Sequence, residues 1–141
     1  MELLSQYHLI AAATIARVFL GLLFFFQGYD AVLRVGMSKA IASYEEGFRP
    51  MGVPRFFTVS AAWFTSLTEL VCGFLLVFGL FEYVALYLLG INLLVAATGF
   101  GIVSPLWDMK HVFPRLVLLL FLLLLPDAWN TWTLDHLFFY H

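Results

Sequence analysis

Apolar residues gather into four long runs along the chain, at residues 9–33, 56–80, 83–103 and 112–129, with short polar connections between them. A helix that crosses a bilayer needs about 20 apolar residues, because each residue advances the helix by about 1.5 Å. The fourth run is interrupted by Pro126, and the aromatic residues around and after its end are typical of a belt at the membrane interface. The pattern predicts a single all-α domain over residues 1–141, built as a bundle of four transmembrane helices.

The connection between the first two runs, residues 34–55, is the longest one. Its apolar residues recur at helical spacing with charged residues between them, the apolar set being Met37, Ala40, Ile41, Tyr44 and Phe48 and the charged set Lys39, Glu45 and Glu46. This alternation predicts a short amphipathic helix that lies on the membrane surface between the first two transmembrane helices. Gly47 can end that helix, and residues 50–54 then predict a turn into the second run.

The composition agrees with a membrane protein and excludes several other classes. Of 141 residues, 63% are hydrophobic and 11% are charged, and the mean hydropathy is +0.96. An ordinary soluble domain has about 45–50% apolar and about 25% charged residues. Seven Lys and Arg residues against nine Asp and Glu residues give a formal net charge of −2, which leaves no basic surface for nucleic acid. A single cysteine, Cys72, excludes an intrachain disulfide or a dithiol motif.

The distribution of cations predicts how the chain is oriented in the membrane. Six of the seven Lys and Arg residues fall at the ends of the runs that share one face, namely Arg34, Lys39, Arg49, Arg55, Lys110 and Arg115. The opposite face, with both termini and the turn at Glu82, has none. Because cations in short loops stay in the cytoplasm, both termini are expected on the non-cytoplasmic side. Residues 1–8 contain Glu2 and no Lys or Arg, so the first run is expected to be a retained helix and not a cleaved signal.

Three polar residues lie inside the predicted spans. Counting residues from the span boundaries places Arg17 ~12 Å, Glu69 ~16 Å and Asn92 ~14 Å below the outer face at helical rise. Ionisable groups in hydrocarbon are costly and need a partner or a function. One interpretation is an internal ion pair of Arg17 and Glu69, supported by Asn92, that fixes the helix register. The other makes this layer the floor of a pocket for a polar headgroup, such as a quinone carbonyl or a small anion, with Glu69 able to carry a proton.

A second polar group, formed by Gln27, Tyr29 and Asp30, lies near the cytoplasmic end of the first span. Arg34 follows Asp30 by one helical turn, which predicts a local ion pair at the interface. The alternative is that this group forms the cytoplasmic mouth of the same pocket.

The histidines do not predict a haem or a metal site. His8 and His111 lie at opposite ends of their spans, while His136 and His141 lie in the C-terminal tail. No two of them share a depth inside the bundle, as a transmembrane haem would require, so haem is not expected. A metal site made of His8, His136 and Glu82 is geometrically conceivable, but we do not expect one.

Several segments resemble the DoxX family of small four-helix membrane proteins. They are residues 17–21 (Arg-Val-Phe-Leu-Gly), 27–30 (Gln-Gly-Tyr-Asp), 52–54 (Gly-Val-Pro), Glu69 and Leu70 with Gly73, Gly79 and Leu80, and residues 133–135 (Thr-Leu-Asp). One departure is Ala31, which stands where the family often has a lysine. The resemblance implies a compact four-helix bundle in a bacterial inner membrane and an association with oxidoreduction, because the family name comes from a subunit of a thiosulfate:quinone oxidoreductase.

Two functional hypotheses follow. The first is a membrane subunit with a pocket for a quinone or lipid, in which Arg17, Glu69 and Asn92 hold the polar head. The second is a non-catalytic structural or assembly subunit of a larger membrane complex, or a homo-oligomer, with its 18% aromatic content as a packing surface. A small permease that uses the polar layer as its constriction is a third possibility, although four helices are few for that.

Overall fold

The computed structural model describes residues 2–103 and 105–139. His141, one of the four histidines considered for a haem or metal site, lies outside the described residues. The described chain is helical and contains no strand. The helices are α1 (Glu2–Tyr29), α2 (Met37–Phe48), α3 (Arg55–Phe78), α4 (Glu82–Val103), α5 (Pro105–Leu124) and α6 (Leu134–Phe139). A π-helical turn (Asp30–Arg34) prolongs α1, and short 3₁₀ turns follow α2 (Arg49–Met51) and α5 (Asp127–Trp129).

Three stretches of the described chain are long and apolar enough to cross a membrane. They are Ser5–Arg34, which joins α1 to its π-helical turn, then α3 (Arg55–Phe78) and α4 (Glu82–Val103). Helix α5 has 20 residues, but it begins seven residues before the expected span and ends at Leu124 rather than at Trp129. It ends there because Pro126 lacks an N–H and disfavours helical geometry at Leu125. The chain then continues in the 3₁₀ turn, where the Trp129 N–H donates to the Pro126 carbonyl at 2.9 Å.

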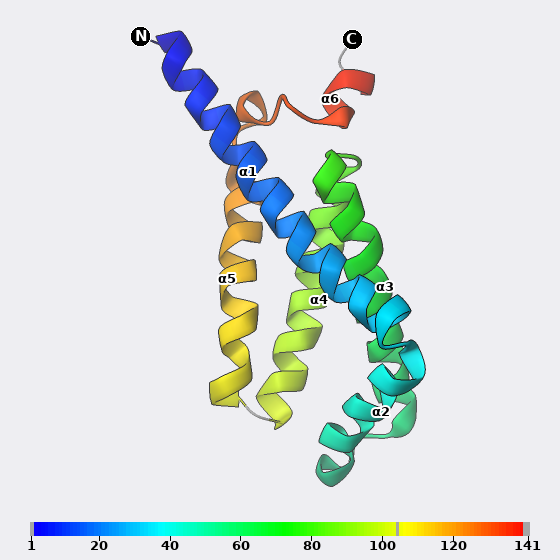
Figure 1. Ribbon diagram of the computed structural model, residues 1–141. Coiled ribbons are helices and arrows are strands. Elements are labelled where there is room, and N and C mark those ends of the chain that lie inside the picture. Colours follow the sequence, from blue (N-terminus) through cyan, green and yellow to red (C-terminus); the bar gives the residue numbers. More distant parts are fainter. Residues whose placement is uncertain (1, 104, 140–141) are drawn as a thin grey trace.

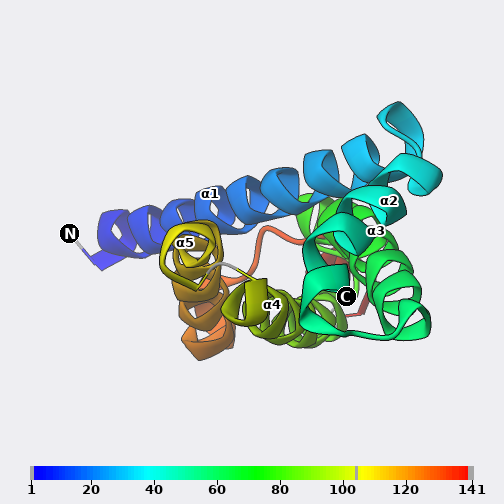
Figure 2. The same cartoon turned by 90° about the horizontal axis from the view of Figure 1, so that it is seen from below.

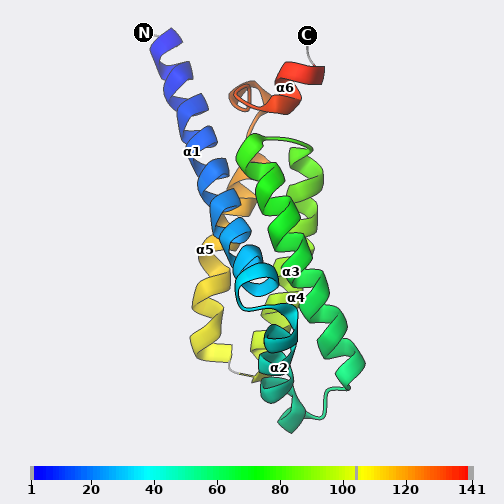
Figure 3. The same ribbon diagram turned by 45° about the vertical axis from the view of Figure 1, so that its right-hand side comes forward.

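Helix α1 crosses the other long helices diagonally. Figure 1 shows it running from the upper end of α5 to the lower end of α3. Seen from below, α1 lies along one side of the molecule, and α5, α4 and α3 follow one another along the other side (Figure 2). Helix α2 packs against the lower part of α3, and α6 lies at the opposite end, where α1 begins (Figure 3).

Backbone contact between α1 and α3 sets their crossing. A Cβ atom on Gly28 would lie 2.3 Å from the Leu70 nitrogen, and one on Gly73 would lie 2.4 Å from the Phe25 nitrogen. Both distances are too short for any side chain, so glycine is required at each position. Close approach through small residues is the usual way in which helices associate in membranes, where lipid removes the hydrophobic drive to pack.

The core of the bundle is apolar and is supplied mainly by α1, α3, α4 and α5. Its buried members include Leu20, Phe24, Leu76, Leu86, Leu89 and Leu119. Most of the remaining aromatic and aliphatic side chains face outwards, including Phe19, Phe26, Phe74 and Tyr87. Exposure on this scale is unfavourable in water and normal in lipid.

Candidate functional site

Arg17 lies where α1 passes the C-terminal end of α3, and it is 2% exposed. Its Nη1 group donates to the carbonyls of Leu76 at 2.7 Å and Val77 at 3.3 Å, and Nη2 donates to the carbonyl of Trp132 at 2.8 Å. The last carbonyls of a helix have no partner within that helix and carry the negative end of its dipole. The guanidinium therefore caps α3 and ties the C-terminal segment to it.

A carboxylate pair completes this network at the start of α4. The Arg17 Nε atom lies 3.9 Å from Glu82 Oε2, which also accepts a hydrogen bond from Asn130 Nδ2 at 2.6 Å. The carboxylate oxygens of Asp135 accept the backbone N–H groups of Phe81 at 2.9 Å and Glu82 at 3.0 Å. Asp135 thus acts as an N-cap for α4 from a distant part of the chain. We call Arg17, Glu82, Asn130, Trp132 and Asp135 the outer clasp.

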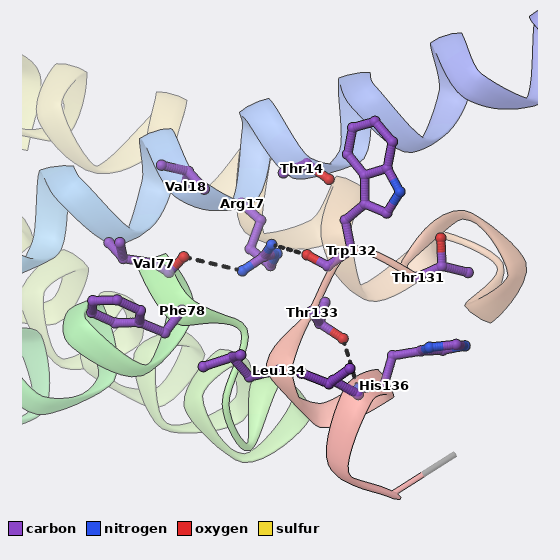
Figure 4. Close-up of a pocket in the computed structure, with 11 residues that line it drawn as sticks. Thr14, Arg17, Val18, Val77, Phe78, Thr131, Trp132, Thr133, Leu134 and His136 are labelled. Atoms are coloured by element: carbon purple, nitrogen blue, oxygen red, sulfur yellow. Dashed lines mark hydrogen bonds between the residues drawn. The ribbon is translucent and has the colours of Figure 1, made fainter. Parts of the chain in front are cut away.

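An open hollow of about 470 Å³ adjoins the outer clasp. Figure 4 shows it between α1, the end of α3 and the segment leading into α6, with Thr14, Arg17, Trp132 and His136 around it. The figure also shows the Arg17 guanidinium directed at main-chain carbonyls. Because both of its Nη groups donate to these carbonyls, the arginine is already engaged in holding the chain together.

The expected ion pair between Arg17 and Glu69 is wrong. Arg17 faces Glu82, and Glu69 lies seven residues before Leu76, which is ~10 Å further along α3 at helical rise. The depth estimate failed because α1 begins at Glu2, well before the assumed boundary, and crosses the bundle diagonally (Figure 1). A residue count along a tilted helix does not measure depth.

Glu69 instead forms a cluster with two amide side chains. Its Oε1 atom accepts hydrogen bonds from Asn92 Nδ2 of α4 and from Gln27 Nε2 of α1, each at 3.1 Å. Glu69 is 6% exposed and Asn92 is 0% exposed, whereas Gln27 is exposed. Gln27, Glu69 and Asn92 form what we call the inner cluster. It brings together three helices and connects a buried carboxylate to the surface of the bundle.

Two further residues act on the inner cluster from other helices. Arg115 of α5 interacts electrostatically with Glu69, and its guanidinium lies 5.6 Å from the centre of the Phe24 ring. Tyr44 approaches from α2. Burial raises the pKa of the Tyr44 phenol above its ordinary value, the negative charge of Glu69 raises it further, and a hydrogen bond with Thr65 opposes the rise. Neither residue was selected from the sequence, because Tyr44 fits an amphipathic helix and Arg115 fits an interfacial cation.

The second predicted polar group does not act as a unit. Gln27 joins the inner cluster, whereas Tyr29 is exposed and its ring lies 6.2 Å from that of Phe25. Asp30 accepts a hydrogen bond from Arg34 at 3.1 Å, which confirms the local ion pair one helical turn apart. Among the described residues, no three His, Cys, Asp or Glu side chains are grouped closely enough to hold a metal ion.

The outer clasp was missed from the sequence except for Arg17. Glu82 was interpreted as a turn marker, and the Arg17 acceptors are main-chain carbonyls that leave no trace in the residue types. A usable signal was Asp135 in the Thr-Leu-Asp segment, since an acidic residue is suited to capping a helix.

Comparison with known protein families matches the DoxX family over residues 12–102, from within α1 to the end of α4. The match covers more than half of the chain and ends before Thr133–Asp135. No curated protein and no solved structure matches the sequence. Taken with the three apolar helices of membrane-spanning length among the described residues, the match shows that the chain is an integral membrane protein of the DoxX family.

Proposed function

We propose that the chain crosses a bacterial inner membrane four times, with α5 as the fourth crossing. The start of α1 and the segment around α6 lie at the same end of the molecule (Figure 1), which supports an even number of crossings. Helix α2 is amphipathic, with Met37 buried against the bundle and Lys39 and Glu46 exposed, and we place it at the cytoplasmic interface. The four cations around α2 at that end, Arg34, Lys39, Arg49 and Arg55, favour both termini on the non-cytoplasmic side.

We propose further that the inner cluster binds the polar head of an amphipathic ligand, most simply a quinone. The observation that carries this proposal is the setting of Glu69. This carboxylate is 6% exposed, and among the described side chains it is held by two neutral amides and no direct ion pair. A buried carboxylate without a paired cation contributes little to stability, because its desolvation is not repaid. In membrane helices such a group is expected to serve a function.

The roles of the residues follow from their donors and acceptors. Glu69 accepts hydrogen bonds and can take up or release a proton from a bound head. Gln27 and Asn92 orient the carboxylate, and Arg115 offsets part of the cost of its charge. Gln27 also reaches the surface, so a ligand can approach along α1 and leave its apolar tail among the exposed aromatic side chains. A quinone, when bound, would supply the redox chemistry.

The proposal is tested by replacing Glu69 with its neutral isostere. The purified full-length protein is titrated in detergent with a decyl-tailed benzoquinone analogue in its oxidised and reduced forms. Glu69→Gln is expected to keep the fold and to weaken binding about tenfold, the effect of losing one charge-assisted hydrogen bond. Glu82→Gln is the matched control, because it makes the same change in the outer clasp and should lower the melting temperature without changing affinity. Binding that Glu69→Gln leaves unchanged would contradict the proposal.

The alternative function is a non-catalytic structural or assembly subunit, and the outer clasp favours it. Every described member of that clasp acts on the chain itself, as a helix cap or as a tie to the C-terminal segment. Extraction in mild detergent separates the two functions. A quinone that copurifies supports the ligand site, whereas a large complex without quinone, together with no thermal shift on adding analogues, supports the structural subunit.

A further inference from the structure

The side chain of Asn92 is fully buried, and only one of its two polar atoms has a hydrogen-bond partner among the described residues. Its Nδ2 group donates to Glu69 Oε1 at 3.1 Å, whereas its Oδ1 atom has no hydrogen-bond partner among the described residues. Asn92 is 0% exposed, so water at the surface of the bundle does not reach this oxygen. A buried acceptor without a donor is unfavourable, and native structures contain few of them.

The carboxylate fixes which way the amide faces. An ionised Glu69 can only accept hydrogen bonds, and the same Oε1 atom also takes the amide of Gln27 at 3.1 Å. Turning the Asn92 amide over would place its oxygen against that carboxylate oxygen, two acceptors in contact. While Glu69 is ionised, the orientation with Nδ2 towards Glu69 is therefore the favourable one, and it leaves Oδ1 as the available group.

The consequence is a chemical preference in the inner cluster. Each amide nitrogen of Gln27 and Asn92 already donates one N–H to Glu69, whereas Asn92 Oδ1 is a buried acceptor that lacks a donor among the described residues. The group of Asn92 that most needs a partner from a ligand is therefore an acceptor. This inference rests on the proposed function: we propose that Asn92 Oδ1 determines specificity by accepting a hydrogen bond from a ligand hydroxyl, so that the site binds a quinol in preference to the corresponding quinone. A quinone head has carbonyl acceptors and no donor for Oδ1. The proposal concerns binding and involves no electron transfer.

Arg115 is the group that could favour the opposite result. Its guanidinium is the cation that acts on Glu69, and it could donate to a quinone carbonyl. The preference for one redox form therefore depends on whether the head engages the acceptor on α4 or the donor on α5, and the two cases give opposite affinity ratios.

The test is a comparison of dissociation constants for full-length protein in detergent under anaerobic conditions. The probes are a decyl-tailed benzoquinol, the same benzoquinone, and n-decanol, which carries a hydroxyl on an aliphatic chain. The quinol is expected to bind about tenfold more tightly than the quinone, which corresponds to one hydrogen bond to a buried acceptor. Asn92→Leu is expected to bring the ratio close to one.

Gln27→Leu is the matched control for the variant at position 92. It also removes an amide donor from Glu69 Oε1 but leaves the Asn92 oxygen in place, so it should weaken both forms and keep their ratio. A melting temperature for Asn92→Leu at or above that of the wild type would support the unpaired acceptor independently of ligand.

The outcomes distinguish this inference from the proposed function. Quinone binding as tight as quinol binding, or tighter, overturns the role of Asn92 and leaves the ligand site standing. Decanol binding as tight as quinol binding overturns the assignment of a quinol as the ligand and indicates a lipid hydroxyl instead. No measurable binding of any probe overturns the proposed function, and this inference with it.

Discussion

At the scale of single residues, the two ionisable side chains of α1 and α3 that the sequence placed in one layer belong to different networks. Arg17 contacts carbonyls at the end of α3 and the carboxylate of Glu82, whereas Glu69 is held by amides. Removing one partner of a buried charged pair is costly, because the other charge remains buried without compensation. The identity of that partner is therefore measurable.

The first prediction concerns double-mutant cycles between Arg17 and each of the two carboxylates. Arg17→Leu alone should lower the free energy of unfolding by ~3–5 kcal/mol. Combined with Glu82→Leu, the loss should be smaller than the sum of the two single losses by ~1–3 kcal/mol, because neither charge is then left alone. Combined with Glu69→Leu, the losses should add within ~0.5 kcal/mol. Reversible unfolding in mixed micelles gives these values, and coupling to Glu69 instead of Glu82 would refute the outer clasp.

At the scale of elements, the crossing of α1 and α3 depends on backbone contact through glycine. Its geometry determines where Gln27 meets Glu69, since the same crossing brings Gly28 onto Leu70, the next residue of α3. Packing at this crossing and the inner cluster are therefore linked. A change that separates the helices should also disturb the hydrogen bond between Gln27 and Glu69.

Alanine at Gly28 tests that link. An added Cβ would lie 2.3 Å from the Leu70 nitrogen, so the helices must separate, and we expect a loss of ~1–3 kcal/mol in stability. Gly90→Ala is the control, because its Cβ would lie 3.8 Å from a Leu119 methyl group, an ordinary contact. There the better helix propensity of alanine should leave stability equal or higher by up to ~1 kcal/mol. Thermal melts in detergent compare the two variants, and equal losses would argue against backbone contact between α1 and α3.

At the scale of the whole molecule, the sequence pattern predicts local structure but not the contacts between residues that are far apart in the chain. The hydrophobic pattern predicted a helix for each of α1 to α5, because burial and helix spacing act within a few residues, but it missed the first seven residues of α1 and of α5. The outer clasp joins Arg17 to the main-chain carbonyl of Trp132, more than a hundred residues away. Every residue has such a carbonyl, so the sequence does not indicate this contact. Asn92 was found because an amide in an apolar helix is unusual, and its partner Glu69 of α3 was expected in the same layer. The residue of α1 that joins them depended on the tilt of α1, and it is Gln27 rather than Arg17.

The last prediction concerns the orientation of the whole bundle. Cys72 is buried, so a membrane-impermeant thiol reagent should give little background labelling. A cysteine placed at exposed Leu137 of α6 should react in intact cells from which the outer membrane has been removed, and one placed at exposed Glu46 of α2 should react only after lysis. The expected sides follow from the four cations around α2 and from the position of α6 at the end where α1 starts (Figure 1). Labelling of both positions from the same side would mean three crossings, with α5 outside the membrane. Reversed labelling would keep four crossings and would show that the cations do not set the orientation.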